Sequence, residues 1–296
     1  MPADPVVATN QTLFAVPNIS EGRDLDAIAA IGAAYASTGA RVLADHHDPD
    51  HNRAVHWIAA APGDLHEALI AGAREVVARL DLRRHQGLHP HVGALDVAPV
   101  VHLDDGRRGA ACAEALVLGE RLGEELGIPV FLYGLLGGGR PRAELRRGGP
   151  QELARRMREG ELKADFGPAE PHPSAGATLV AARPPLIAFN VELEPPATET
   201  DARAIAAAIR EGGPEGLPGV RAIGLSLRAR GAIAQVSTNV EDHRAVPLAR
   251  VVEAVARHAR VAEAELVGLA PATAFDGFPD HIPVRNRATI EDRLTF

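Results

Sequence analysis

The sequence predicts an α/β (α+β) protein with two ferredoxin-like subdomains of the βαββαβ type, residues 1–180 and 181–296, which form a cleft. Two observations predict this fold. Apolar patterns in both halves of the chain follow the same order of strand, helix, strand, strand, helix and strand. Between these halves lies Asp165–Gly176, which has too many Pro and Gly residues for regular structure and is expected to be an ordered loop or an interdomain crossing.

The first half supplies the elements of one subdomain. The run of β-branched and aromatic residues at Thr12–Val16 predicts the first strand. Apolar residues recur at helical spacing over Asp24–Ser37, and Gly39 follows as a stop, so this segment predicts a helix. The remaining elements are predicted as the strands Arg41–Asp45 and Arg53–Ala61, a helix from Pro62 to about Leu80, and the strand Ala94–Val101.

The second half repeats this order after a longer connection. The connection is predicted as the helix Arg107–Leu126, ended by Gly127, the strand Pro129–Tyr133 and a basic helical segment over Arg142–Glu159. The repeated order consists of the strand Leu186–Leu193, the helix Thr200–Glu211, the strands Val220–Arg228 and Ala232–Asn239, the helix Pro247–Val261 and the strand Glu265–Leu269. A short helix at Ile290–Leu294 is expected after an irregular segment.

Composition and charge limit the classes of function. The 296 residues are 46% hydrophobic and 24% charged, as in soluble globular proteins, and no apolar run reaches the roughly 20 residues of a membrane span. The net charge of −8 argues against a nucleic-acid partner. The start of the chain does not read as a signal peptide, and a single cysteine, Cys112, fits a reducing compartment. We therefore expect a cytoplasmic protein without membrane partners.

Two polar loops in the first half hold the candidate chemistry. Residues 46–52 read HHDPDHN, and residues 85–93 read HQGLHPHVG before the predicted strand Ala94–Val101. Eight of the 13 histidines lie between His46 and His91. In a βαββαβ unit, the loop between strands two and three can meet the loop before strand four at one edge of the sheet. A polar loop at the end of a rigid strand is a common place for a site.

Three interpretations of these loops stay open. In the first, the histidines with Asp45, Asp48 and Asp50 bind Zn, Fe or Mn, although neither loop has a known metal-ligand spacing. In the second, one histidine is a general base, while Asn52 and Arg53 hold a substrate carboxylate. In the third, the loops only form turns through side-chain hydrogen bonds.

Three other segments have features that occur in anion-binding sites. Asn18–Gly22 follows the first strand and opens a helix, so its N–H groups either receive an anion or are capped by the chain itself. Arg140–Lys163 has eight basic and four acidic residues, which suits either docking of a polyanionic tail or a solvated helix face. Gly134–Gly139 lacks the GKS/T ending of a P-loop.

Seven segments, in order, resemble the glutamate formimidoyltransferase family, which is the formiminotransferase part of formiminotransferase–cyclodeaminase. They are AVPNISEGRD (15–24), DPDHNRAV (48–55), RRHQGLHPHVGALDVAP (83–99), GERLGEELGIPVFLYG (119–134), DFGP (165–168), HPSAGATLVAARPPLIAFNVEL (172–193) and IAQVSTN (233–239). The resemblance implies transfer of a formimino group from N-formimidoyl-L-glutamate to N5 of tetrahydrofolate in histidine breakdown. It also implies folate between two α/β subdomains, and a homodimer.

The resemblance further implies roles for single residues. The family's catalytic histidine matches His89, whose neutral imidazole would take a proton from N5 and return it to the departing glutamate nitrogen. Substrate contacts are expected from eight residues in and near these motifs: Asn18, Glu21, Asp45, His46, Asn52, Arg53, His91 and Gly93. The folate-binding segment is expected to include Gly167, Pro168, His172, Pro173, Ser174, Ala175 and Gly176. No metal is expected.

The sequence also departs from the family pattern. His91 stands where the family usually has Arg, GGPQEL (148–153) replaces GEYEGL, and FDGFPDHIPVRN (275–286) replaces an aliphatic segment. Alternative functions are formyl transfer between 5-formyltetrahydrofolate and glutamate, metal-dependent hydrolysis of formiminoglutamate by His and Asp ligands, and a silent folate or amino-acid binding module. We expect any cyclodeaminase to be a separate chain, because 296 residues leave no room for it.

Overall fold

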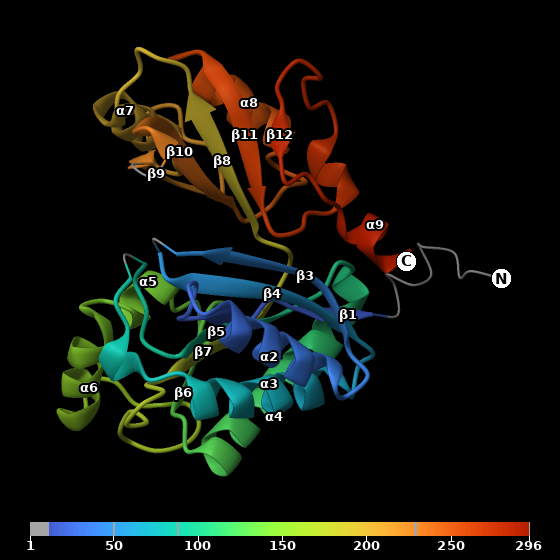
Figure 1. The fold of residues 1–296 in the computed structure, drawn as a ribbon, viewed down its shortest axis with the longest axis vertical. Helices are drawn as coiled ribbons and strands as arrows, with labels where there is room; N and C mark the ends of the chain where they lie inside the picture. Colours follow the sequence, from blue (N-terminus) through green and yellow to red (C-terminus); the bar gives the residue numbers. More distant parts are fainter. Residues whose placement is uncertain (1–11, 50, 88, 228–229, 296) are drawn as a thin grey trace. The chain divides into compact units, whose positions relative to one another are not determined.

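A computed structural model describes residues 12–49, 51–87, 89–227 and 230–295 of the chain (Figure 1). The chain divides into two compact units, residues 1–183 and 184–296, and each unit has its own sheet. This mixed α/β architecture with two sheets confirms the predicted fold class. Within the described ranges no helix is both long and apolar enough to cross a lipid bilayer.

The first unit is built on a βαββαβ core. Its elements are a first strand split into β1 (Leu13–Ala15) and β2 (Asn18–Ile19), then α2 (Leu25–Ala36), β3 (Arg41–Asp48), β4 (Arg53–Ala60), α3 (Leu65–Arg79) and β5 (Leu95–Val101). The order across the sheet is β3, β4, β1 with β2, and β5, so the first and third strands lie at the centre. Side chains of α2 and α3 pack on one face of this sheet in a shared apolar core.

Two parallel strands extend this sheet beyond β5. The helix α4 (Arg108–Leu126), ended by Gly127 at a φ of 64°, leads to β6 (Val130–Leu132), and β7 (Thr178–Arg183) pairs with both β5 and β6. We did not predict β7 from the sequence. A strand buried on both faces shows no alternation of polar and apolar residues, and the preceding Pro- and Gly-rich segment hides its start.

Two further predictions for this unit are wrong. β3 continues past Asp45 to Asp48, because it pairs with β4 as far as the Asp48–Arg53 pair, so the polar loop is shorter than expected. The basic segment is two helices, α5 (Arg142–Leu145) and α6 (Gly149–Arg158). The helical backbone is interrupted at Gly148 and at Gly149, the first residue of α6, because their φ values of 72° and 71° are left-handed. Apolar residues of α5 and α6 pack on the sheet face opposite to α4.

The second unit repeats the βαββαβ order. Its elements are β8 (Ile187–Leu193), α7 (Glu199–Ile209), β9 (Val220–Leu227), β10 (Ile233–Val240), α8 (Leu248–Ala256), β11 (Val261–Val267), β12 (Val284–Arg285) and α9 (Ile290–Leu294). The order across the sheet is β9, β10, β8, β11 and β12, which places the first and third strands at the centre again. The residue Arg228, predicted to end a strand, lies outside the described residues.

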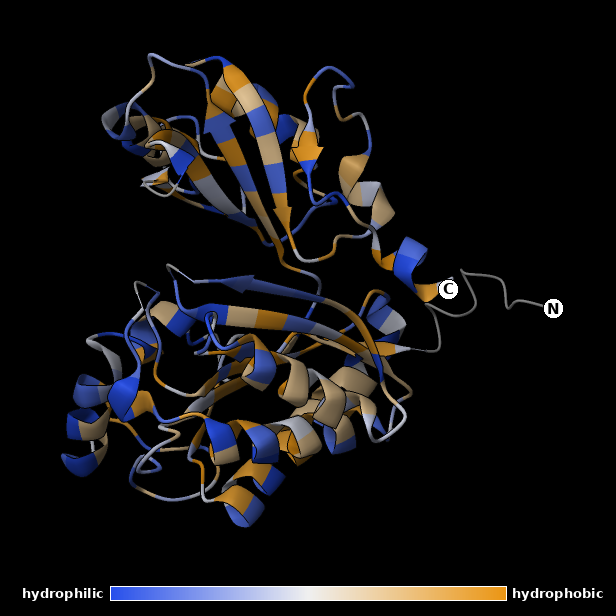
Figure 2. Ribbon diagram, in the orientation of Figure 1, coloured by the Kyte–Doolittle hydropathy of each residue, from blue (hydrophilic) through white to orange (hydrophobic). Residues whose placement is uncertain are grey.

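Apolar and polar residues alternate along β8 and β11, as Figure 2 shows. Phe189 and Val191 enter the core with α7 and α8, whereas Asn190 lies on the other face. The helix predicted over Pro247–Val261 is too long, since α8 ends at Ala256. Val261 already pairs with Leu193 of β8 as the first residue of β11.

Candidate functional site

The two histidine loops of the first unit touch each other. The Asn52 side-chain amide donates to Gln86 O at 3.2 Å and lies 3.3 Å from His85 Nδ1. A Cβ added to Gly87 would lie 2.4 Å from His51 O, so the two backbones approach too closely for a larger residue. The loops after β3 and before β5 therefore meet, as the strand order of a βαββαβ unit allows.

A buried ion cluster lies beside these loops. Asp96 is fully buried, and its carboxylate accepts from Arg53 Nη1 at 2.8 Å, from the Arg146 guanidinium and from Val92 N–H at 2.8 Å. Burial works to raise the pKa of Asp96, but the two arginines and the Val92 N–H outweigh it and lower this pKa to about 2. Asp96 is therefore ionised at neutral pH and is shared by two cations.

A β-bulge aims Asp96 at these arginines. Ile19 of β2 pairs with Leu95, whereas the preceding Asn18 pairs with Val97, so Asp96 is an extra residue on β5. A bulge of this kind bends the strand and redirects a side chain.

Arg53 connects this cluster to β2. Its Nε donates to Asn18 Oδ1 at 3.0 Å, and Asn18 Nδ2 donates to Val16 O at 2.8 Å. Burial lowers the pKa of Arg53 to about 10, with Asp96 opposing that effect. Arg53 thus stays charged at neutral pH. Its hydrogen bond to Asn18 also brings together two of the predicted substrate contacts.

His89 lies next to this cluster as a neutral, half-buried imidazole. Burial lowers its pKa to about 3, and the charges of Arg53 and Arg146 contribute to the same effect. In the described part of the chain, its buried Nδ1 has no hydrogen-bond partner. The ring centroid lies 6.1 Å from that of His51. An uncharged imidazole is the form that can accept a proton.

His91 contacts its own loop. Its Nδ1 lies 3.1 Å from His89 O, and its ring meets that of His85 edge-on at a centroid distance of 4.4 Å. Because the backbone oxygen can only accept, this contact requires the proton of His91 to be on Nδ1.

Glu21 satisfies the N–H groups that follow β2. Its Oε1 accepts from the backbone N–H of Gly22, Arg23 and Asp24 at 2.9, 2.7 and 3.0 Å. These contacts support the interpretation that the chain itself caps the N–H groups after β2.

Asp45 lies in the strand β3 as predicted, and His46 lies in the same strand rather than in the loop. They stand opposite His56 and Val55 of β4, with Asp45 exposed and His46 half-buried. The β3–β4 hairpin is therefore longer than the sequence pattern predicts.

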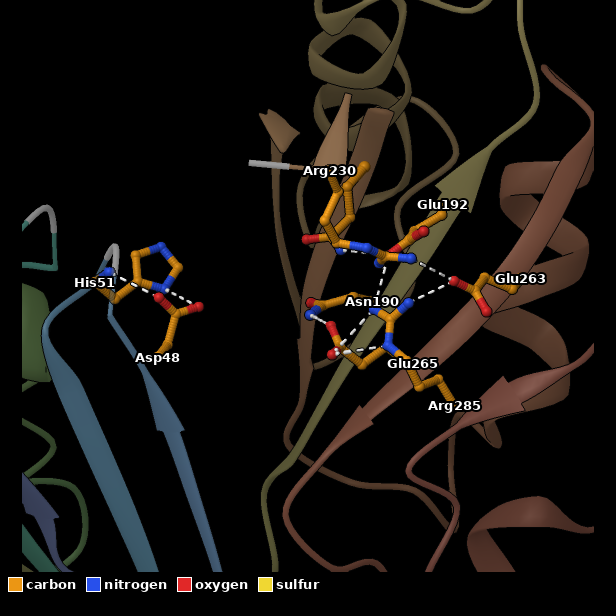
Figure 3. A network of polar contacts seen from close by, with 9 residues as sticks. Asp48, His51, Asn190, Glu192, Arg230, Glu263, Glu265 and Arg285 are labelled. Atoms are coloured by element: carbon orange, nitrogen blue, oxygen red, sulfur yellow. Dashed lines mark hydrogen bonds and ion pairs between the residues drawn. The ribbon is translucent and has the colours of Figure 1, made fainter. Parts of the chain in front are cut away.

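The proposed metal ligands do not gather. Across the described stretches, no group of three or more His, Cys, Asp or Glu side chains is placed to hold a metal ion. Asp48 and His51 form a pair with 3.4 Å between Oδ2 and Nδ1 (Figure 3). Asp50, another predicted ligand, lies outside the described residues.

A small cavity lies beside the joined loops. Its volume is ≈ 170 Å³, and Ser20, Glu21, Asn52 and His85 are part of its wall. A larger cavity of ≈ 560 Å³ lies in the second unit near the start of α7 and the end of α8. None of the predicted site residues lines the larger cavity, so size alone does not identify the site.

The sheet of the second unit carries a separate polar network (Figure 3). Glu192 is buried and accepts from Arg230 and, at 2.8 Å, from Arg285. Arg285 also pairs with Glu265 at 3.0 Å, and Arg230 pairs with Glu263 at 2.9 Å. These pairs join β12 and the turn before β10 to the central strand β8, which is a structural role.

Both units match known sequence families. Residues 12–183 match the formiminotransferase domain, N-terminal subdomain, and residues 188–292 match the formiminotransferase domain. The chain belongs to the formiminotransferase family. This result confirms the resemblance drawn from the seven sequence motifs.

Formiminotransferase relatives cover the chain to different extents. Glutamate formimidoyltransferase of Thermoplasma acidophilum is 36% identical over 273 residues, which are 88% of both chains. Glutamate formimidoyltransferase of Streptococcus pyogenes serotype M1 is 35% identical over 270 residues, 88% of this chain and 89% of that protein. Formimidoyltransferase-cyclodeaminase of Sus scrofa is 38% identical over 280 residues, 90% of this chain but only 51% of that protein. The chain thus spans about half the length of the longer formiminotransferase relatives.

The segment expected to hold folate in the formiminotransferase family forms a tight loop before β7. His172 Nδ1 accepts from the N–H groups of Ser174 and Ala175 at 3.3 and 3.0 Å. Ala175 is buried, and its oxygen accepts from Ala94 N–H at 2.9 Å, which ties the loop to the start of β5. Pro173 is exposed.

Two glycine positions of the same prediction, Gly167 and Gly176, have no room for a side chain. A Cβ on Gly167 would lie 2.7 Å from Ile128 O, and one on Gly176 would lie 2.3 Å from Val92 O. Gly176 also pairs with Gly93, another predicted contact. These glycines permit close backbone packing, while Pro168 is exposed.

Sequence reasoning missed two members of the buried ion cluster, Asp96 and Arg146. Asp96 carried a usable signal, because a lone carboxylate in the apolar run LDVAPVV has to be paired when it is buried. Arg146 carried none, since its partner lies 50 residues away and its neighbours form a basic run.

Proposed function

We propose that the chain transfers a formimidoyl group from N-formimidoyl-L-glutamate to N5 of tetrahydrofolate in histidine degradation, with His89 as general acid–base. The names of its two full-length relatives, both glutamate formimidoyltransferases, support this activity. One structural observation carries the mechanism: a neutral His89 lies beside a buried cluster in which two arginines share a single carboxylate.

The reaction needs one proton acceptor and one proton donor. A bond forms between N5 and the amidine carbon, and the bond from that carbon to the glutamate nitrogen breaks. The proton that leaves N5 ends on the departing glutamate nitrogen. His89 takes this proton on its neutral ring and delivers it, so a single side chain serves both steps.

Arg53 and Arg146 connect substrate binding to the strength of this base. In the free protein their charges and burial lower the pKa of His89 to about 3, which is low for a general base at neutral pH. A substrate carboxylate bound at the arginines would cancel part of their charge. Loss of this smaller contribution would raise the pKa of His89, while burial, the larger cause, would still hold it below its usual value.

The proposal also assigns residues of the first unit to the two substrates. Asn18, Asn52 and Arg53 serve the glutamate part of the donor, and Gly167–Gly176 serves tetrahydrofolate as co-substrate. A homodimer in the cytoplasm, without a resident metal, completes the proposal.

A turnover assay with each substrate omitted in turn tests the proposal. His89→Gln is expected to lower turnover by roughly 10²–10⁴-fold, because general acid–base catalysis has that typical size. His281→Gln, which changes an exposed histidine of the second unit, is the matched control. Transfer without the pterin, or full activity of His89→Gln, would refute the mechanism. Offering the formyl analogue of the donor in the same assay separates formimidoyl from formyl transfer.

A further inference from the structure

Three hydrogen-bond donors gather near the Asp96 cluster without an acceptor. Within the described residues, the side chain of Arg142 makes no ion pair or hydrogen bond, and its guanidinium carbon lies 5.6 Å from the centre of the Tyr133 ring. The Tyr133 hydroxyl and the Arg146 Nε–H are buried and also lack a hydrogen-bond partner in this part of the chain.

The helix α5 brings these groups together. Arg142 is the first residue of α5 and Arg146 is its C-cap, four residues later with helical backbone angles, so the two side chains lie on the same side of the helix. The Arg146 guanidinium already donates to Asp96 through Nη2, which leaves its Nε–H for another acceptor. Tyr133 follows β6 directly and is buried in the same apolar cluster as Leu145 of α5.

The local charge is unbalanced. Arg53, Arg142 and Arg146 lie around one buried carboxylate, that of Asp96. Burial lowers the pKa of Arg142, and the charges of Arg183 and Arg146 lower it further, against the opposing influence of Tyr133 and Asp96. The Tyr133 hydroxyl and the Arg146 Nε–H are the buried ones among these donors, and a buried donor without a described partner points to a ligand that accepts from it.

We propose that Arg142, Arg146 and Tyr133 form a receptor for a glutamate carboxylate. Two guanidinium groups and a hydroxyl match the planar, multiply accepting carboxylate better than they match a neutral group. Both the formimidoyl donor and the glutamyl tail of the folate carry such a carboxylate. The identity of these ligands rests on the proposed function, whereas the receptor itself rests on the unpaired donors.

Equilibrium binding of L-glutamate to the full chain is the first test. Arg142→Gln is expected to weaken binding roughly 10–100-fold, because a hydrogen bond to a charged group is lost. Tyr133→Phe keeps the packed ring and should weaken binding roughly 2–10-fold. Arg158→Gln removes an equal charge from an exposed position on α6 and should bind like the unmodified chain.

Kinetics of the same variants identify the source of the carboxylate. A raised KM for the donor with an unchanged KM for tetrahydrofolate assigns the receptor to the donor, and the reverse pattern assigns it to the folate tail. Arg142→Lys should restore part of the affinity, since it keeps the charge but loses the planar fork. Thermal unfolding of each variant excludes loss of the fold as the cause.

The binding and kinetic results together distinguish failure of the carboxylate receptor from failure of the proposed transferase activity. The receptor is refuted if the unmodified chain does not bind L-glutamate. It is also refuted if Arg142→Gln and Tyr133→Phe both bind L-glutamate as tightly as the unmodified chain, even where transfer is intact. If binding depends on Arg142 but no transfer occurs with either substrate pair, the receptor stands and the proposed activity fails.

Discussion

Asp96 is the residue on which the site of the first unit depends. It lies in an apolar strand and pairs with two guanidinium groups that are themselves almost buried. Such an arrangement contributes little net stability compared with an apolar core, but it is costly to break, because the remaining charges stay buried. The bulge at this position therefore serves the arrangement of Arg53 and Arg146 more than the strength of the sheet.

Asp96→Asn tests this dependence. We expect the free energy of unfolding to fall by about 3–5 kcal/mol, since Arg53 and Arg146 lose their shared counter-charge. Urea unfolding followed by circular dichroism measures the change. Asp280→Asn, at an exposed position, is the control and should leave the unfolding midpoint in place. Equal midpoints for both variants would show that Asp96 does not hold the arginines.

His89 makes stability depend on pH. Its pKa is lowered from 6.5 to about 3 in the folded chain, so the unfolded chain binds the proton more readily. The contribution of His89 is therefore complete above about pH 6.5 and is lost as the pH falls toward 3. His89→Gln should lose less stability than the unmodified chain between pH 7 and pH 4.5, as thermal unfolding can measure. Parallel stability curves would contradict the buried, neutral imidazole.

At the scale of elements, the packing of α2 on α3 depends on one glycine. A Cβ added to Gly72 of α3 would lie 1.9 Å from the ring of Tyr35, which is fully buried on α2 and has no room to move. Helices approach this closely only where one of them carries a very small residue.

Gly72→Ala is therefore expected to lower the free energy of unfolding by about 1–3 kcal/mol through overpacking. The matched control is Gly109→Ala in α4, where an added Cβ meets nothing within 4 Å. That change should leave stability unchanged or raise it by up to about 1 kcal/mol, because alanine favours the helix. Chemical denaturation of both variants measures the contrast, and similar effects at both positions would refute the packing argument.

At the scale of the whole molecule, each unit has its own sheet and its own apolar core. Phe189→Ala removes a fully buried ring from the core of the second unit. We expect a loss of about 3–5 kcal/mol in the stability of that unit. Hydrogen exchange should show the lost protection mainly in residues 187–294. An equal loss over both units would mean that they unfold as one.

The order of strands and helices in both units could be predicted from sequence, because periodicity reports which face of an element is buried. The exceptions have local causes. β7 is buried on both faces and shows no alternation, and β3 continues through polar residues because β4 pairs with it. Gly148 and Gly149 could have marked the break between α5 and α6, since two adjacent glycines disfavour a continuous helix.

For the candidate site too, some features could be predicted from the sequence and others only from the tertiary structure. Sequence alone determined the family and the two βαββαβ units, because these depend on patterns that are continuous in the chain. Only the tertiary structure decided that Asp96 pairs with both Arg53 and Arg146. It also decided that Arg142 lies over the Tyr133 ring, where both side chains have hydrogen-bond donors without a described acceptor. The physical reason is that charge pairing and burial are set by distance in space, and residues far apart in the chain carry no local pattern that records their contact.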